Sequence, residues 1–203
     1  MENWKSVCAV IDMQGFFVDK RFYPRELVIL NDTKNLYFNI DSELDIKDIN
    51  DQKLIHKLTF QKHFIHGIPI KSEDKWNILT LKADKIRELL PYMYQKIKTQ
   101  DKLYFACKNQ QVSKILKELK IPFVDLEHTI IGGEICPSLK KFDIQLSNKD
   151  LYFCKVHTCL TDVNSPFFRN LRCSSRKCNH IWKWLNNKII VEKIFEGFNN
   201  LEL

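Results

Sequence analysis

The sequence predicts an α/β fold in which helices flank a mixed β-sheet. Two observations carry this prediction: three apolar segments with short links open the chain, and an alternation of strand-like and helix-like segments follows them. With 203 residues the chain has the length of one domain and can bury a sizeable core, so we expect a single domain over residues 1–203. A hydrophobic content of 44% with 28% charged residues is typical of globular proteins rather than disordered ones.

The opening segments are apolar runs bounded by polar and turn-forming residues, which is the pattern of mostly buried strands. We expect these three strands at residues 7–11, 25–30 and 35–40. The apolar spacing then changes to a helical period over residues 45–64. Because the links between the strands are short, the start of the chain is predicted to form an antiparallel meander followed by a helix.

The second part of the chain alternates between the two periods. Strands are predicted at residues 103–106, 123–126 and 151–154, and helices at residues 82–98, 110–119 and 174–185. Residues 70–80 read as a loop, and Pro91 predicts a kink or a break in its helix. Because a strand, a helix and a second strand follow one another, we expect parallel pairing in this part of the sheet.

Charge and cysteine content limit the class of protein. A net charge of +7 favours a polyanionic partner, most obviously nucleic acid. The seven cysteines are an odd number and no secretory leader opens the chain, so we expect reduced thiols in an intracellular protein of the cytoplasm or the nucleus. No apolar run is long enough for a membrane span, which argues against a membrane partner.

Two carboxylates stand at the ends of predicted strands, Asp12 after the first and Glu26 at the start of the second. RNase H-like nucleases begin in this way, and DEDD-class exonucleases use four carboxylates to hold two divalent cations. The Asp-x-Glu motif of that class reads Asp12-Met13-Gln14 here, and the helix that should carry the next acid reads Asn109-Gln110-Gln111-Val112. Because an amide binds a hard cation more weakly than a carboxylate does, the sequence predicts a degenerate two-metal site.

The last motif of these exonucleases, His-x4-Asp, is present as His157 and Asp162. It leaves open a working, magnesium-dependent DEDDh 3′–5′ exonuclease. In that alternative the catalytic residues are Asp12, His157 and Asp162, with Asp125 or Glu26 as the fourth carboxylate. Otherwise no catalytic residue is assigned.

His157 also belongs to a second motif, Cys154-x2-His157, whose spacing is typical of zinc sites. Further candidates follow it in the sequence, namely Cys159, Cys173, Cys178 and His180. Zinc prefers four N, S or O ligands, and a carboxylate from a distant strand can complete such a set. The alternative is a group of buried, apolar cysteines near a hydrogen-bonded histidine. Since a zinc ligand cannot also be a free general base, zinc at His157 excludes the exonuclease.

Four short motifs together resemble one family. They are Pro24-Arg25-Glu26-Leu27-Val28, His66-Gly67-Ile68, Cys136-Pro137-Ser138-Leu139, and Cys154-x2-His157 with a later cysteine. In these motifs the chain resembles the MAEL domain of the Maelstrom family, which belongs to the germline piRNA pathway, and the resemblance spans about residues 6–186. It implies an RNase H-like, DEDDh-exonuclease-like fold that has lost its catalytic acids and binds a structural Zn²⁺ through a Glu-Cys-His-Cys set.

Position by position, the resemblance assigns the zinc ligands Glu26, Cys154, His157 and Cys173. The gap that follows His157 is longer than the family pattern, so Cys178 and Cys159 stay as alternatives for the last ligand. An insertion over residues 161–171 would account for this gap.

The resemblance also implies binding of single-stranded RNA, piRNA-pathway proteins as partners in small-RNA silencing, and an RNA endonuclease activity that does not use the lost acids. Basic residues interleaved with aromatic ones agree with RNA binding. The candidates are Lys62, His63, His66, Arg169, Arg172 and Arg176. Two alternative explanations need no RNA: Lys62, His63 and His66 can form a solvated helix end, and Trp182 or Trp184 can pack in the core. A protein–protein adaptor on the same scaffold is the alternative function.

Overall fold

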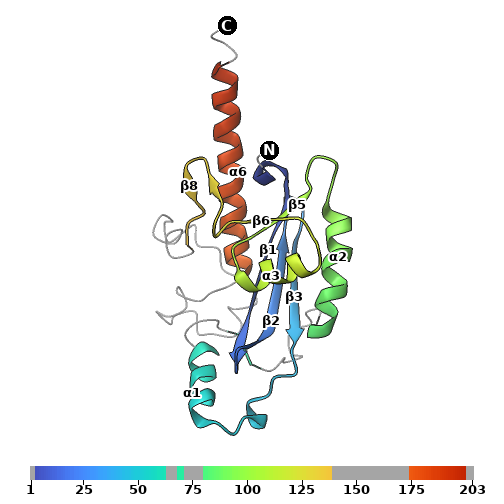
Figure 1. Ribbon diagram of the computed structural model, residues 1–203, viewed down its shortest axis with the longest axis vertical. Coiled ribbons are helices and arrows are strands. Elements are labelled where there is room, and N and C mark those ends of the chain that lie inside the picture. Colours follow the sequence, from blue (N-terminus) through green and yellow to red (C-terminus); the bar gives the residue numbers. More distant parts are fainter. Residues whose placement is uncertain (1–2, 63–67, 71–79, 139–173, 200–203) are drawn as a thin grey trace.

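The centre of the molecule is a six-stranded sheet with helices on both faces (Figure 1). The computed structural model describes residues 3–62, 68–70, 80–138 and 174–199, with side chains of the last helix up to residue 194. The strands of the sheet are β1 (Val7–Val18), β2 (Arg21–Leu30), β3 (Asn35–Asp41), β4 (Thr80–Lys82), β5 (Tyr104–Cys107) and β6 (Phe123–Asp125). They lie in the order β4-β3-β2-β1-β5-β6.

The sheet is mixed, as predicted. β1, β2 and β3 form the antiparallel meander, while β5 pairs parallel to β1 and β6 pairs parallel to β5. At the other edge β4 pairs parallel to β3, a strand that was not predicted because three residues carry too little pattern. A separate hairpin of β7 (Ile130–Ile131) and β8 (Glu134–Ile135) turns through Gly132 and Gly133, whose φ angles of 55° and 77° suit glycine.

The described helices differ in length from the predicted ones. They are α1 (Gln52–Phe60), α2 (Ile86–Ile97), α3 (Gln110–Glu118) and α6 (Ser174–Asn199), with 3-10 turns at Asn3–Ser6, Ile46–Asp48 and Ala83–Lys85. α2 continues through Pro91, so the alternative of a break there is wrong. α6 is longer than predicted and extends past the end of the sheet (Figure 1). None of the described helices is long and apolar enough to span a bilayer.

Side chains of β1 and β2 alternate between two faces of the sheet. One face packs against α2 and α3 through a cluster that includes Ile11, Met13, Leu27, Ile29, Leu90 and Leu116. The other face packs against α6 through a cluster that includes Val10, Val28, Cys178, Ile181 and Leu185. A third cluster lies at the far end of β1, where Phe16 contacts Leu58 of α1.

Gly15 lies at an irregularity of β1, between the residues that face α6 and the third cluster. The pairing of β1 with β2 shifts between Gln14 and Gly15, and a Cβ atom on Gly15 would lie 2.1 Å from the carbonyl oxygen of Tyr23. A side chain at this position would therefore push the two strands apart.

Arg25 ties a distant segment to the sheet. Arg25 is 2% exposed, and its guanidinium group donates hydrogen bonds to the carbonyl oxygens of Ile40 and, at 3.1 Å, Pro69. Burial lowers the pKa of Arg25 to about 10, although Asp41 nearby acts in the opposite direction. Neighbouring residues of a strand point to opposite faces of the sheet. Because Arg25 points away from α6, the side chain of Glu26 points towards it.

Candidate functional site

Asp12 lies within β1 and is fully buried, with an exposed fraction of 0%. Its Oδ1 atom accepts hydrogen bonds from Nζ of Lys177 at 2.8 Å and from Nδ2 of Asn109 at 3.1 Å, and Oδ2 accepts one from Nε2 of Gln14 at 3.4 Å. We call these four residues the Asp12–Lys177 cluster. Because a buried carboxylate without partners is strongly destabilising, these contacts explain why the core tolerates Asp12.

Lys177 enters the cluster from the first turn of α6. Its side chain is 20% exposed, and Nζ makes a second contact of 2.8 Å with the carbonyl oxygen of Lys108, just after β5. The ammonium group therefore bridges Asp12 of β1 and the backbone at the carboxyl end of β5. This bridge joins α6 to two adjacent parallel strands.

Asn109 fills two structural roles at once. Its side-chain oxygen caps α3 by accepting the amides of Gln111 and Val112, at 2.9 and 3.3 Å. Its side-chain nitrogen donates to Asp12 and, at 2.7 Å, to the carbonyl oxygen of Met13. The start of α3 thus presents an amide donor to Asp12 and no carboxylate.

Glu26 lies opposite Gln14 in the register of β1 and β2 and is also 0% exposed. Its Oε2 atom accepts a hydrogen bond from the hydroxyl of Tyr37 at 3.1 Å, and Oε1 accepts one from the backbone amide of Ser174 at 2.9 Å. Ser174 is the first residue of α6, so this carboxylate lies where the helix dipole favours negative charge.

The other predicted zinc ligands, Cys154, His157 and Cys173, lie outside the described residues, as do Cys159 and Asp162. Cys178, an alternative ligand, is buried on the side of α6 that faces the sheet, with its Sγ atom 4.0 Å from the carbonyl oxygen of Val28. Burial raises the pKa of this thiol well above its usual value, so Cys178 behaves as an apolar core residue. Within the described ranges, no group of three His, Cys, Asp or Glu side chains could hold a metal ion.

The alternative catalytic carboxylate Asp125 makes its contacts within its own turn. It accepts the amide of Glu127 at 3.0 Å and pairs with Nδ1 of His128 at 3.1 Å. The structure thus surrounds Asp12 with amides and an ammonium group, whereas Asp125, the last residue of β6, bonds to the turn that follows this strand.

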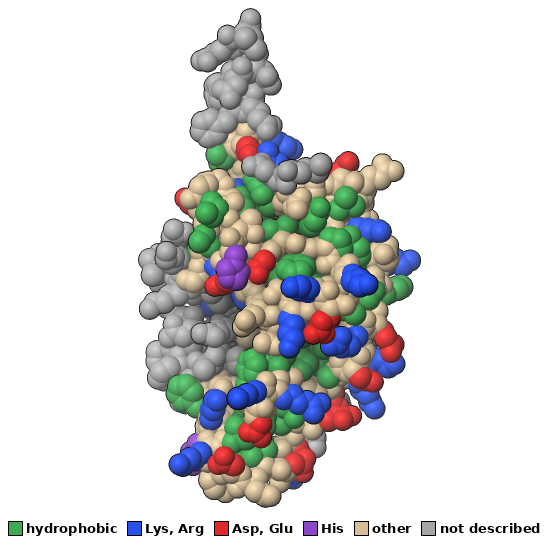
Figure 2. All heavy atoms as spheres, in the orientation of Figure 1, with side chains coloured by type: hydrophobic (Ala, Val, Ile, Leu, Met, Phe, Trp, Pro, Cys, Tyr) green, Lys and Arg blue, Asp and Glu red, His purple; other side chains and the backbone are tan. Residues whose placement is uncertain are grey.

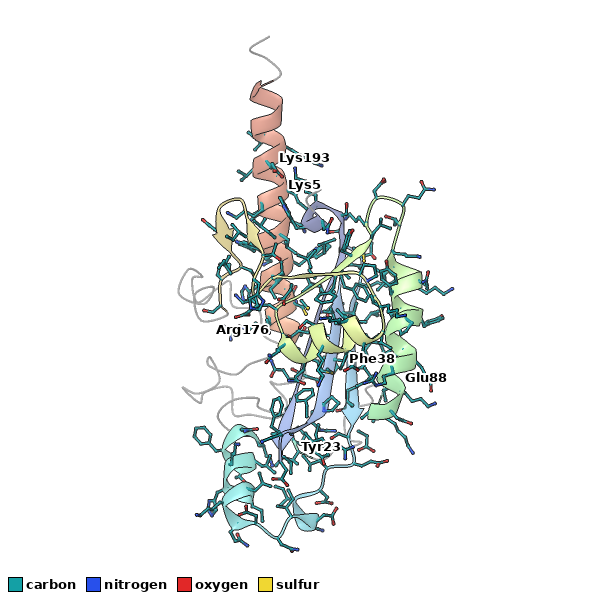
Figure 3. All side chains as sticks on the ribbon, viewed as in Figure 1. Lys5, Tyr23, Phe38, Glu88, Arg176 and Lys193 are labelled. Atoms are coloured by element: carbon teal, nitrogen blue, oxygen red, sulfur yellow. The ribbon has the colours of Figure 1, made fainter. Side chains whose placement is uncertain are left out.

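The predicted RNA-binding residues are spread over different environments. Arg176 is 6% exposed in the first turn of α6 (Figure 3), which does not suit a direct phosphate contact. Lys62 follows α1 and is half-buried. The remaining candidates, His63, His66, Arg169 and Arg172, lie outside the described residues.

The exposed side of α1 carries basic and aromatic side chains together. Lys53, His56, Lys57 and Phe60 recur at helical spacing and are all exposed, Phe60 by 55%, while Leu58 faces the core. The helix contains no acidic residue, and Figure 2 shows basic side chains over this end of the molecule, beside acidic ones of the preceding segment. We call these four residues the α1 surface; the sequence indicated a basic, aromatic segment here but not which of its side chains are exposed.

Comparisons with protein-family models, with curated proteins and with solved structures find nothing that matches this chain. Function is therefore inferred from two regions of the molecule, the Asp12–Lys177 cluster and the α1 surface. The Asp12–Lys177 cluster offers one charged carboxylate already paired with an ammonium group, and the α1 surface offers positive charge beside an exposed aromatic ring.

Proposed function

We propose that this chain is a zinc-stabilised, catalytically degenerate, exonuclease-like domain of RNase H type that binds single-stranded RNA. The observation that carries the proposal is the environment of Asp12. A two-metal nuclease needs several carboxylates around its cations, whereas Asp12 is held by two neutral amides and the ammonium group of Lys177.

The mixed sheet supports the RNase H-like assignment. A meander of three antiparallel strands is continued, beyond β1, by the parallel strands β5 and β6, with α3 between them in sequence. Asp12 on β1 meets Asn109 at the start of α3, where an exonuclease of this class would have acids on both elements.

Glu26 supports the zinc assignment. The carboxylate accepts a hydrogen bond from the backbone amide of Ser174, the residue that follows Cys173 in the sequence. Each carboxylate oxygen has two lone pairs, so its hydrogen bonds do not prevent metal coordination. A carboxylate, two thiolates and an imidazole form a donor set that suits tetrahedral Zn²⁺. Zinc bound to Glu26, Cys154, His157 and Cys173 would fasten the start of α6 to β2.

The zinc assignment is tested by elemental analysis of the purified wild type, Cys173→Ala and Cys178→Ala. We expect stoichiometric zinc in the wild type and in Cys178→Ala, and loss of zinc with marked destabilisation in Cys173→Ala. Zinc lost only in Cys178→Ala would make Cys178 the ligand. A zinc-free protein with magnesium-dependent nuclease activity that Asp12→Asn abolishes would refute the proposal and restore the exonuclease alternative.

The α1 surface supports the RNA assignment. Lysines attract phosphates, and an exposed aromatic ring offers a stacking platform for an unpaired base. Lys57 and Phe60 are one turn apart on the same side of α1, so a backbone phosphate and a base of one strand can contact them together. A role in small-RNA silencing, in the cytoplasm or the nucleus, is the setting that we propose for this binding.

RNA binding is tested with a labelled single-stranded oligonucleotide over a range of salt concentrations. We expect Lys53→Gln/Lys57→Gln to lower the slope of log affinity against log salt by roughly 1–1.5, because two phosphate contacts are lost. Phe60→Ala should weaken binding by about tenfold or more through lost stacking. The matched control is Lys114→Gln/Lys117→Gln on α3, whose lysines are also exposed. Equal effects of both lysine pairs would remove the α1 surface as the binding site.

A protein–protein adaptor is the second candidate function. The observation that favours it is on α6, where Ile190, Val191 and Ile194 are 55%, 49% and 52% exposed on the part that extends past the sheet. Such a protein would show no affinity for RNA even at low salt, where phosphate contacts are strongest. That result, with zinc present, would replace the RNA-binding function by the adaptor.

A further inference from the structure

The surroundings of the Lys177 ammonium group are those of a hard cation. Nζ lies 2.8 Å from Oδ1 of Asp12 and 2.8 Å from the carbonyl oxygen of Lys108. Carboxylate and backbone carbonyl oxygens are also the protein ligands that Mg²⁺ and Ca²⁺ take. An ammonium group has three N–H donors for such acceptors and carries its positive charge on a compact head.

In the part of the chain that the structure describes, charge compensation at Asp12 comes from Lys177. The other described partners of the carboxylate, Gln14 and Asn109, are neutral amides, so among the described contacts only Lys177 balances the negative charge. The carboxylate is 0% exposed, and water therefore cannot take over this task.

The backbone of α6 fixes where the ammonium group lies. In the same turn as Lys177, the amide of Ser174 binds Glu26, and Cys178 and, one turn later, Ile181 are buried against the sheet. Asp12 and Glu26 point to the same face, since both contact this turn (Figure 3, where Arg176 marks it). Lys177 can therefore leave Asp12 only if its own side chain swings out or the start of α6 detaches from the sheet.

We infer that Lys177 is a built-in cation that takes, at Asp12, the place of a divalent metal ion. While α6 is docked, the ammonium group satisfies the carboxylate and keeps divalent ions out. The inference deepens the proposed function and rests on it for the identification of Asp12 as a former metal ligand. It predicts that removing the ammonium group opens a cation site made of Asp12, the Lys108 carbonyl and the amide oxygen of Gln14 after rotation.

The test is the response of the melting temperature to millimolar MnCl2 in four proteins. They are the wild type, Lys177→Met, Asp12→Asn/Lys177→Met, and the control Lys183→Met, which removes an exposed lysine from the same helix. We expect Lys177→Met to melt about 10 °C below the wild type, because it leaves a buried charge unpaired, and to regain several degrees with Mn²⁺. The other three proteins should show no response to Mn²⁺.

Several outcomes would overturn the inference. A folded Lys177→Met that ignores Mn²⁺ has no cation site at Asp12, and a wild type that responds as strongly as Lys177→Met does not exclude the ion. If Lys177→Met is recovered only unfolded, refolding with and without Mn²⁺ decides: native circular dichroism regained only with Mn²⁺ supports the inference, and no recovery with Mn²⁺ refutes it. Zinc content and RNA affinity test the proposed function separately, so either idea can fail without the other.

Discussion

The two faces of the β1–β2 pair solve the same packing problem with different chemistry. On the face covered by α2 and α3, both strands contribute apolar side chains such as Ile11 and Ile29 to one cluster, and the buried Arg25 of β2 bonds to backbone carbonyl oxygens. On the face covered by α6, apolar residues such as Val10 are followed along the strand by Asp12 and Gln14, which lie beside Glu26. One face is a hydrophobic core, and the other is a core with a buried polar centre.

The difference between the two faces is not one that maximises the stability of the fold. Apolar side chains of similar volume usually serve stability at least as well as a buried ion pair, so the polar centre is not explained by stability alone. Buried polar groups of this kind are typical of functional sites or of their remnants. The apolar face can be regarded as scaffold, and the α6 face as the side that carries the proposed remnant of a metal site.

Of the substitutions that test the difference between the two faces, Asp12→Asn should have the largest effect on stability. It leaves the Lys177 ammonium group without its counter-ion, and we expect the free energy of unfolding to fall by about 3–5 kcal/mol. Combining Asp12→Asn with Lys177→Met should recover much of that loss, since both charges are then gone. Urea unfolding of the three variants measures the effect. Simple addition of the two single losses in the double variant would mean that the pair is not coupled.

A second effect should follow from His180, which is 6% exposed on α6. Burial lowers the pKa of His180 from 6.5 to about 4, with Arg176 and Lys183 contributing. Between these pH values the unfolded chain binds a proton that the folded protein does not, so stability is fully present above pH 6.5 and falls as the pH drops towards 4. The loss should reach about 1–3 kcal/mol and be absent in His180→Gln. If the free energy of unfolding has the same pH dependence in the wild type and in His180→Gln, folding does not change the pKa of His180.

The smallest effect is expected on the apolar face. Ile29→Val removes one buried methylene group and should cost about 0.5–1.5 kcal/mol. Its side chain lies on the opposite face from Asp12 and shares no described hydrogen bond with it, so the combination with Asp12→Asn should be additive within about 0.5 kcal/mol. A larger coupling would mean that the two faces respond to substitution as one unit.

The sequence was informative where a pattern repeats. The meander, β5, α3 and β6 were all predicted, because their apolar residues recur with the period of a strand or a helix. The continuation of β1 to Val18 was missed, since it joins a separate small cluster with α1. The length of α6 was missed as well, because its last turns lack one continuous apolar stripe facing the sheet.

The candidate site was only half predictable. Asp12 and Glu26 stand out at the ends of the predicted strands, although the longer β1 and β2 place both inside a strand, and the missing acids at Gln14 and beside Asn109 could be read directly. Lys177 could not be found in this way, because a lysine on a helix usually faces solvent and no periodic pattern links it to a carboxylate 165 positions earlier. Only the tertiary packing of α6 reveals that contact.

That separation along the chain has a consequence for biosynthesis. A ribosome completes the meander, with Asp12 inside it, long before Lys177 and the rest of α6 emerge. Until then, Val10 and Val28 lack their contacts with α6, and Asp12 lacks its cationic partner. Nascent chains that stall before α6 should therefore expose apolar surface and bind chaperones. Docking of α6 should be a late step of folding.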